Sequence, residues 1–156
     1  MDKVIIGLII FLMVVVIFYL YIAALKQKNM KALEEKLSQY GTLKKEKGSY
    51  EYSLKRNGNL YKIKVCYANH TREVSFNSRK HWQLTNSNGS KMLNTKGFED
   101  VSGNKICLIV PNVEKVIRYI NENEVVFVKP SMDIWGMNVL LVSQLDAYFN
   151  VSGVEK

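Results

Sequence analysis

The sequence opens with an apolar segment that a domain of this size could not bury. Residues 4–25 read VIIGLIIFLMVVVIFYLYIAAL, and none of these side chains carries a charge. As a helix rising about 1.5 Å per residue, the segment would be roughly 33 Å long, enough to cross a hydrocarbon core about 30 Å thick. Residues 1–25 are therefore predicted to form a transmembrane anchor, and the chain is predicted to be a single-pass protein of the lipid bilayer.

A cleaved signal peptide is the main alternative for this segment. Signal peptides have a shorter apolar stretch, about 7–15 residues, followed by a cleavage site with small residues at fixed positions. The best candidate site here, Ile22-Ala23-Ala24, has a bulky residue where a small one is needed. A buried core helix is a poorer alternative, because such a helix is seldom apolar on all sides. The sequence favours an uncleaved anchor.

The basic residues around the span predict its orientation. One lysine precedes the span and seven follow it within residues 26–47, and basic residues are retained on the cytoplasmic side of a membrane. The domain after the span is therefore predicted to be cytoplasmic, in keeping with only two cysteines, Cys66 and Cys107. Three glycosylation triplets, at Asn69, Asn88 and Asn150, keep a second possibility open: an exported domain held outside by an uncleaved signal anchor.

Residues 26–47 form a basic juxtamembrane segment. Seven lysines and three glutamates leave it a net charge of +4, and its apolar residues predict a helix that continues to about Gln39. Lysines beside a membrane attract anionic lipid headgroups, each contributing about 1 kcal/mol. We expect Lys26, Lys28 and Lys31 to contact such headgroups. The competing interpretation is that these lysines only set the topology.

The segment after residue 48 begins with three stretches in which polar and apolar residues alternate. They cover residues 50–54, 61–67 and 72–76. Alternation with period two is typical of half-buried strands, and Asn57-Gly58 between the first two suits a tight hairpin turn. The sequence therefore predicts a three-stranded antiparallel meander.

The remainder of the chain predicts a strand-helix-strand unit. The expected elements are an irregular loop (86–105), a strand (106–110), a helix (113–120), a strand (124–129) and a closing strand or strand-to-helix passage (138–149). The helix is expected because Val113, Val116 and Ile120 fall on one helical face after a capping Asn112. Residues 48–156 are thus predicted to be one small α+β domain.

No pattern in the sequence commits the domain to a catalytic chemistry. It contains no nucleophile elbow, no phosphate-binding glycine loop and no dinucleotide fingerprint. Cys66, His70 and His81 do not provide the paired ligand spacings of a zinc site. We therefore expect no catalytic residues, no metal and no cofactor, and a non-enzymatic role is favoured.

The predicted element order, an acidic helix, a meander, and then a helix and a strand, resembles the core of the PD-(D/E)xK restriction-nuclease-like superfamily. Such a resemblance implies metal-dependent cleavage of nucleic acid. The family motif needs an acidic residue two positions before a lysine, whereas the meander here has Lys62-Ile63-Lys64 or Glu73-Val74-Ser75. No site residues are carried over, and a membrane-tethered enzyme, including a divergent nuclease-like one, is the alternative function.

Basic and aromatic residues gather at Arg79, Lys80 and Trp82, which we predict to be a partner-binding or anion-binding site. Interleaved cations and aromatics also occur in nucleic-acid sites. However, half of the net charge of +8 lies in the juxtamembrane segment, which argues against nucleic acid. The predicted function is a binding module at the membrane surface, acting on an unidentified protein partner or on the membrane itself.

Overall fold

The computed structural model describes residues 3–151 and divides the chain into two compact units, residues 1–39 and 40–156. Each unit is described by itself. The second unit begins before residue 48, the predicted start of the domain, because strand β1 (Thr42–Lys45) pairs with the first sheet.

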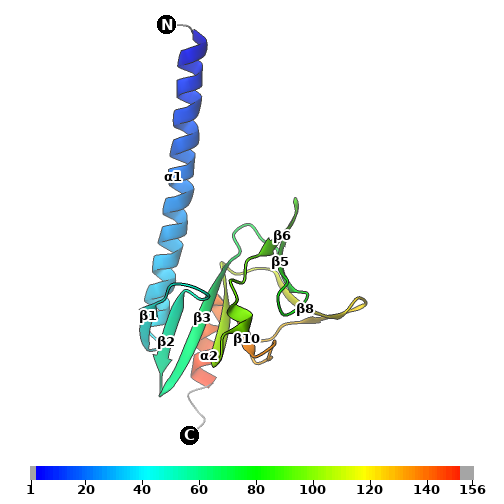
Figure 1. The fold of residues 1–156 in the computed structure, drawn as a ribbon. Helices are drawn as coiled ribbons and strands as arrows, with labels where there is room; N and C mark the ends of the chain where they lie inside the picture. The colour runs from blue at the N-terminus through cyan, green and yellow to red at the C-terminus, as the bar shows by residue number, and fades with distance from the viewer. Residues whose placement is uncertain (1–2, 152–156) are drawn as a thin grey trace. The chain divides into compact units, whose positions relative to one another are not determined.

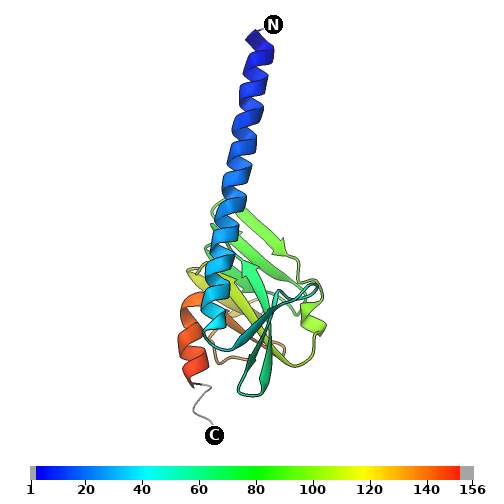
Figure 2. The ribbon, with the colours of Figure 1, turned by 90° about the vertical axis from the view of Figure 1, so that its left-hand side faces the viewer.

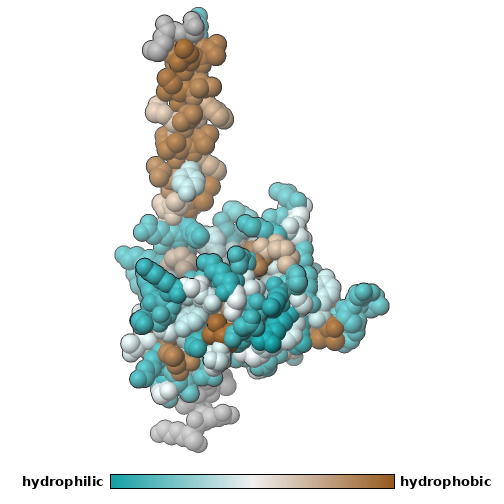
Figure 3. All heavy atoms as spheres, viewed as in Figure 1, coloured by the Kyte–Doolittle hydropathy of each residue, from teal (hydrophilic) through white to brown (hydrophobic). Residues whose placement is uncertain are grey.

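The first unit is one uninterrupted helix, α1 (Lys3–Ser38), as the sequence predicted. Its 36 residues correspond to about 54 Å at the usual helical rise. It is long and apolar enough to cross a membrane, although a signal sequence near the N-terminus has the same properties. Figure 3 shows its N-terminal part as a continuous hydrophobic surface, whereas the domain surface in that view is mostly hydrophilic.

The second unit is built almost entirely of strands (Figures 1 and 2). After β1 come β2 (Tyr52–Arg56), β3 (Asn59–Tyr67), β4 (Glu73–Phe76), β5 (Trp82–Asn86), β6 (Gly89–Leu93), the 3₁₀ turn η1 (Phe98–Asp100), β7 (Asn104–Val110), β8 (Lys115–Asn121), β9 (Glu124–Phe127), β10 (Met137–Leu141), the 3₁₀ turn η2 (Val142–Gln144) and α2 (Leu145–Val151). With α1, the chain is α+β overall, and both sheets contain parallel and antiparallel pairs.

The first sheet has the strand order β1-β2-β3-β7-β10. The β2–β3 hairpin turns at Asn57 and Gly58, whose φ angles of 47° and 79° confirm the predicted tight turn. Strand β1 also pairs antiparallel with β2, whereas the last two pairings, β3 with β7 and β7 with β10, are parallel. The predicted strand at residues 106–110 is confirmed as β7, and its side chains from Lys105 to Val110 are all buried.

The second sheet has the strand order β6-β5-β4-β8-β9 and contradicts the predicted meander. Strand β4, expected to pair with β3, instead pairs with β5 and in parallel with β8. The alternation of Val74 and Phe76 correctly indicated a strand with one face in the core. Alternation does not say which strand is the neighbour, because any half-buried strand has the same period.

The predicted helix at residues 113–120 is wrong, because this segment forms strand β8. Val116 is half-buried toward the core and Ile117, on the opposite face, is also buried. Apolar residues on both faces of a strand produced the spacing that resembled a helix. The strand-helix-strand unit, and with it the element order of the nuclease-like family, is therefore absent from the described residues.

The predicted loop at residues 86–105 contains more structure than expected. Strand β6 and the turn η1 lie within it, and Phe98 from η1 is fully buried. The closing segment follows the strand-to-helix alternative: β10 runs into α2 through η2, while the predicted strand at 124–129 is confirmed as β9.

The two sheets share one hydrophobic core. Cys66, Cys107 and Ile109 of the first sheet belong to the same buried cluster as Phe76 and Trp82 of the second. The indole ring of Trp82 lies 5.2 Å from the Phe76 ring and 6.4 Å from that of Phe98. Aromatic pairs in this distance range add to the burial energy.

Helix α2 is held to the first sheet by Phe149. Its ring lies 4.9 Å from the Tyr40 ring and 5.5 Å from the Tyr61 ring. The Arg56 guanidinium donates hydrogen bonds to the main-chain oxygens of Tyr40 (3.0 Å) and Phe149 (3.2 Å). Tyr40 also donates its hydroxyl to Asp146, and burial together with this carboxylate raises the pKa of Tyr40 to about 12.

Candidate functional site

The three lysines predicted to contact lipid, Lys26, Lys28 and Lys31, are exposed on α1. At about 100° per residue, Lys28 and Lys31 lie within roughly 60° of each other and Lys26 lies on a different side of the helix. They surround the helix and do not form a single stripe. Their contact with anionic headgroups stays a prediction.

Arg79 and Lys80 lie in the turn between β4 and β5, which is closed by the hydrogen bond from Asn77 N to His81 O at 2.9 Å. The Arg79 Nη2 atom donates to Glu99 O at 2.9 Å and lies 3.3 Å from Asp100 Oδ1. Arg79 therefore links this turn to η1. Lys80 is exposed in the same turn.

Trp82 must be removed from the predicted binding site. Its side chain is 0% exposed and packs in the core between the sheets. Its Nε1 atom donates to Arg79 O at 3.1 Å, which satisfies the one polar group of the ring. Sequence proximity to two cations suggested a surface role, whereas β5 directs this side chain inward.

Two buried charged residues, Glu99 and Lys105, lie next to the Arg79 turn. Lys105 Nζ donates to Glu99 O at 2.9 Å, so this one carbonyl oxygen accepts from two cations. Burial lowers the pKa of Lys105. Although burial alone would raise the pKa of Glu99, hydrogen bonds from its own backbone and Thr95 and the nearby cations lower it. Arg79 and Lys105 hold η1 in place through Glu99 O, and Arg79, with 56% of its side chain exposed, and the exposed Lys80 are both accessible to an external anion.

The two cysteines are structural in their surroundings. Both are fully buried, and burial raises the pKa of Cys66 to about 12 and that of Cys107 well above its ordinary value.

Lys64 lies on the same face of β3 as Cys66 and is only 2% exposed. Its Nζ atom is 3.8 Å from Glu51 Oε1 and donates to Ser49 O.

Metal-ligand residues do not gather within the described part of the chain. Across residues 3–151 there is no group of three or more His, Cys, Asp or Glu side chains that could hold an ion. His81 Nδ1 lies 2.8 Å from the Ser78 hydroxyl, and His70 occupies a turn position with φ of 58°.

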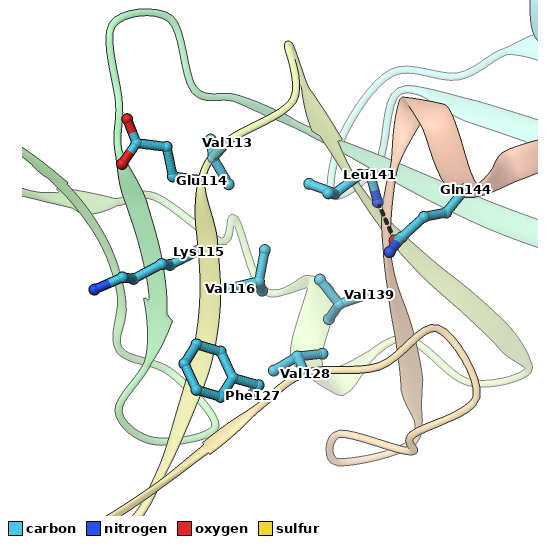
Figure 4. A pocket seen from close by; sticks show the side chains of 9 residues that line it. All are labelled: Val113, Glu114, Lys115, Val116, Phe127, Val128, Val139, Leu141 and Gln144. Atoms are coloured by element: carbon cyan, nitrogen blue, oxygen red, sulfur yellow. Dashed lines mark hydrogen bonds between the residues drawn. The ribbon is translucent and has the colours of Figure 1, made fainter.

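A pocket of about 190 Å³ opens between β8–β9 and β10 (Figure 4). It is lined by Val113, Glu114, Lys115, Val116, Phe127, Val128, Val139, Leu141 and Gln144. Figure 4 shows the charged ends of Glu114 and Lys115 directed away from the hollow, while the valines face one another across it. The Gln144 amide oxygen is occupied by the Leu141 N–H at 2.9 Å. The pocket is a gap of mixed polarity in the seam between the sheets, and its lining residues bring no reactive groups together.

The free edge of β9 is the most exposed apolar feature of the domain. Phe127 is 67% exposed and Val125 49%, and Tyr119 and Ile120 of β8 are exposed beside them. The β8–β9 hairpin (yellow in Figure 1) projects from the rest of the domain. Val125 is paired with Tyr119, and Phe127 with Ile117, so these four side chains share the outer face of the second sheet.

The other sheet edges are protected in ways that β9 is not. Strand β1 presents Lys44 and Lys45, and β6 carries Lys91 at its middle position. Strand β10 is largely buried, and the segment before it folds back through a bridge from Asp133 to Asn138. Lysines and covering segments are a usual protection of a sheet edge. Strand β9 has no charge between Glu124 and Lys129.

Sequence reasoning predicted the strand at 124–129 but did not show that it forms an exposed edge of a sheet. Its uninterrupted apolar run is also typical of a strand buried on both faces, so the sequence did not distinguish an edge strand from a central strand.

A comparison of the chain with known protein families, with characterised proteins and with solved structures found no match.

Proposed function

We propose that this chain is a single-pass membrane protein whose domain acts as a binding module for a protein partner at the cytoplasmic surface of the membrane. The observation that carries the proposal is the exposed apolar edge formed by Val125 and Phe127 of β9, with Tyr119 beside them. Exposed apolar surface of this kind is costly unless a partner covers it.

The anchor supports this role. A candidate span of the length of α1 would confine the domain to a layer at the bilayer surface, which raises its local concentration toward other membrane-bound chains. Weak contacts then suffice for binding. The basic excess after the span supports the cytoplasmic orientation.

Site-specific photocrosslinking tests the binding role. A benzophenone amino acid replaces Tyr119, which is 38% exposed beside β9, in the full chain in its native membrane. The matched control places the same amino acid at Leu60, which is 48% exposed on the first sheet. We expect a discrete protein adduct from position 119 and none from position 60. Absence of an adduct at 119, or equal labelling at both positions, would refute a binding surface here.

Labelling of a cysteine added after Lys156 tests the orientation. Both native cysteines are buried, so an impermeant reagent reports the added thiol. We expect labelling only after cell lysis. Labelling of intact cells would instead establish the exported alternative, in which the glycosylation triplets become relevant.

A further inference from the structure

We infer that the partner of β9 is a second copy of this chain, whose own β9 adds antiparallel to it. The two five-stranded sheets would then join into one continuous ten-stranded sheet with a two-fold axis at Val126. This inference deepens the proposed function, on which it rests, by identifying the partner of the same surface.

The backbone of β9 has the hydrogen-bonding groups that this pairing needs. Val128 N donates to Val116 O at 2.9 Å, and these residues are directly opposite in the β8–β9 register. In an antiparallel pair, only alternate residues bond to the neighbour. The main-chain N–H and C=O groups of Val126 and Val128 therefore point toward β8, while those of Val125 and Phe127 point toward the free edge.

Two-fold symmetry restricts the register of two such edges. Directly opposite residues in a sheet point to the same face, so a symmetric antiparallel pair must be centred on a residue and not between two residues. Centring on Val126 places Val125 of each copy opposite Phe127 of the other. All outward groups of these two residues then pair, which gives four hydrogen bonds between the copies.

The same register completes the apolar face. On the outer side of the sheet, Tyr119 and Val125 of one copy would continue directly into Phe127 and Ile117 of the other, and the symmetry repeats this row. Each Phe127 ring, 67% exposed in the single chain, would lie against a valine of the second copy. Cross-strand pairs of aromatic and β-branched residues are among the favourable ones in sheets.

The charges favour an antiparallel copy. Glu122 lies in the turn before β9, Glu124 is the first residue of the strand, and Lys129 follows the strand. Antiparallel pairing brings the acidic end of each strand beside the basic end of the other, whereas parallel pairing would bring like charges together. The same glutamates would be repelled by anionic lipid, which argues for a protein and against the membrane as the occupant.

Disulfide trapping of the full chain tests the pairing. A residue on the two-fold axis faces its own copy in a non-hydrogen-bonded pair, with Cα atoms about 4.5 Å apart, within the range of a disulfide. The Val126→Cys variant is placed in vesicles at a low protein-to-lipid ratio and oxidised with copper phenanthroline. The controls are the wild type, whose cysteines are buried, and Lys91→Cys on the β6 edge.

We expect most of the Val126→Cys chain to form a reducible dimer, at least tenfold more than Lys91→Cys. Adding Val125→Lys should lower the dimer yield at least tenfold, while adding Leu60→Lys should not change it. Val125 and Leu60 are 49% and 48% exposed, so both lysines replace surface side chains that are similarly exposed. A yield from Val126→Cys equal to that of Lys91→Cys would overturn the inference.

Single-molecule photobleaching of the labelled wild type in the same vesicles gives a second readout that does not depend on a β9 substitution. Two bleaching steps are expected, and only one step would also overturn the inference. The photocrosslinking at position 119 then separates the two proposals. An adduct of another mass with no trapped dimer leaves the binding function standing and refutes the second copy, whereas no adduct and no dimer refutes both.

Discussion

The two sheets of the domain differ in what covers their exposed parts. The first sheet has lysines on β1, a fold-back segment at β10, and α2 held by Phe149. The second sheet ends in β9, where Phe127 is exposed and uncovered by any described element. One phenylalanine, Phe149, is thus buried against the first sheet and stabilises it, whereas another, Phe127, is exposed on the second sheet. Comparison of the sheets separates residues that hold the fold from those available to a partner.

Truncating the two phenylalanines would break this comparison most directly. We expect Phe149→Ala to lower the free energy of unfolding by about 3–5 kcal/mol, because it removes a buried ring and its aromatic contacts. Phe127→Ala should cost less than about 1 kcal/mol in the single chain. Chemical denaturation in detergent at a concentration that keeps chains separate measures both. Equal losses would show that β9 is part of the core.

Thiol reactivity sharpens the description of the first sheet. With the pKa of Cys66 raised from 9.0 to about 12, its thiolate fraction at pH 8 falls by about 10³. Neither cysteine should react with an aromatic disulfide reagent in the folded chain, and both should react in guanidinium. Protonated thiols contribute stability below pH 9, and this contribution falls as the pH rises toward 12. Rapid reaction of the folded chain would contradict the burial.

Removing the partner of Lys64 tests the buried charge beneath the same sheet. Glu51→Ala is expected to cost about 2 kcal/mol, since Glu51 also accepts the Val65 N–H at 2.7 Å. The double variant with Lys64→Met should recover part of this loss, because no unpaired cation is then buried. Denaturation curves of the wild type, Glu51→Ala, Lys64→Met and the double variant measure the coupling energy. No recovery would mean that the lost Val65 hydrogen bond, and not the charge pair, determines the effect.

The smallest effect on stability is expected at the free edge. Val125→Lys should change the free energy of unfolding by less than about 0.5 kcal/mol, because its backbone groups and side chain point away from the core. The thermal unfolding midpoint of this variant, compared with Leu60→Lys, checks this. A large loss would show that Val125 supports the fold itself.

The sequence predicted individual helices, turns and strands better than it predicted which strands pair with each other. The long helix, the Asn57-Gly58 hairpin and the strands at β7 and β9 follow from apolar runs and turn residues, which are local signals. The assignment of β4 to a second sheet depends on contacts with β8, whose paired residues are 42 positions further along the chain (Glu73 with Lys115), and no local pattern contains such contacts. Trp82 was misplaced for the same reason, because neighbouring cations in the sequence do not reveal on which face of a strand a ring lies.

The parallel pairing of β3 with β7 has a consequence for biosynthesis. Strand β3 ends at Tyr67 and its neighbour begins at Asn104, so β3 emerges from the ribosome before its partner exists. At about 5–20 residues per second, the wait for the remaining strand is roughly 2–9 s. During that time the β2–β3 hairpin has an unpaired edge. Nascent chains of this protein are therefore most vulnerable to mispairing before residue 110 has been synthesised.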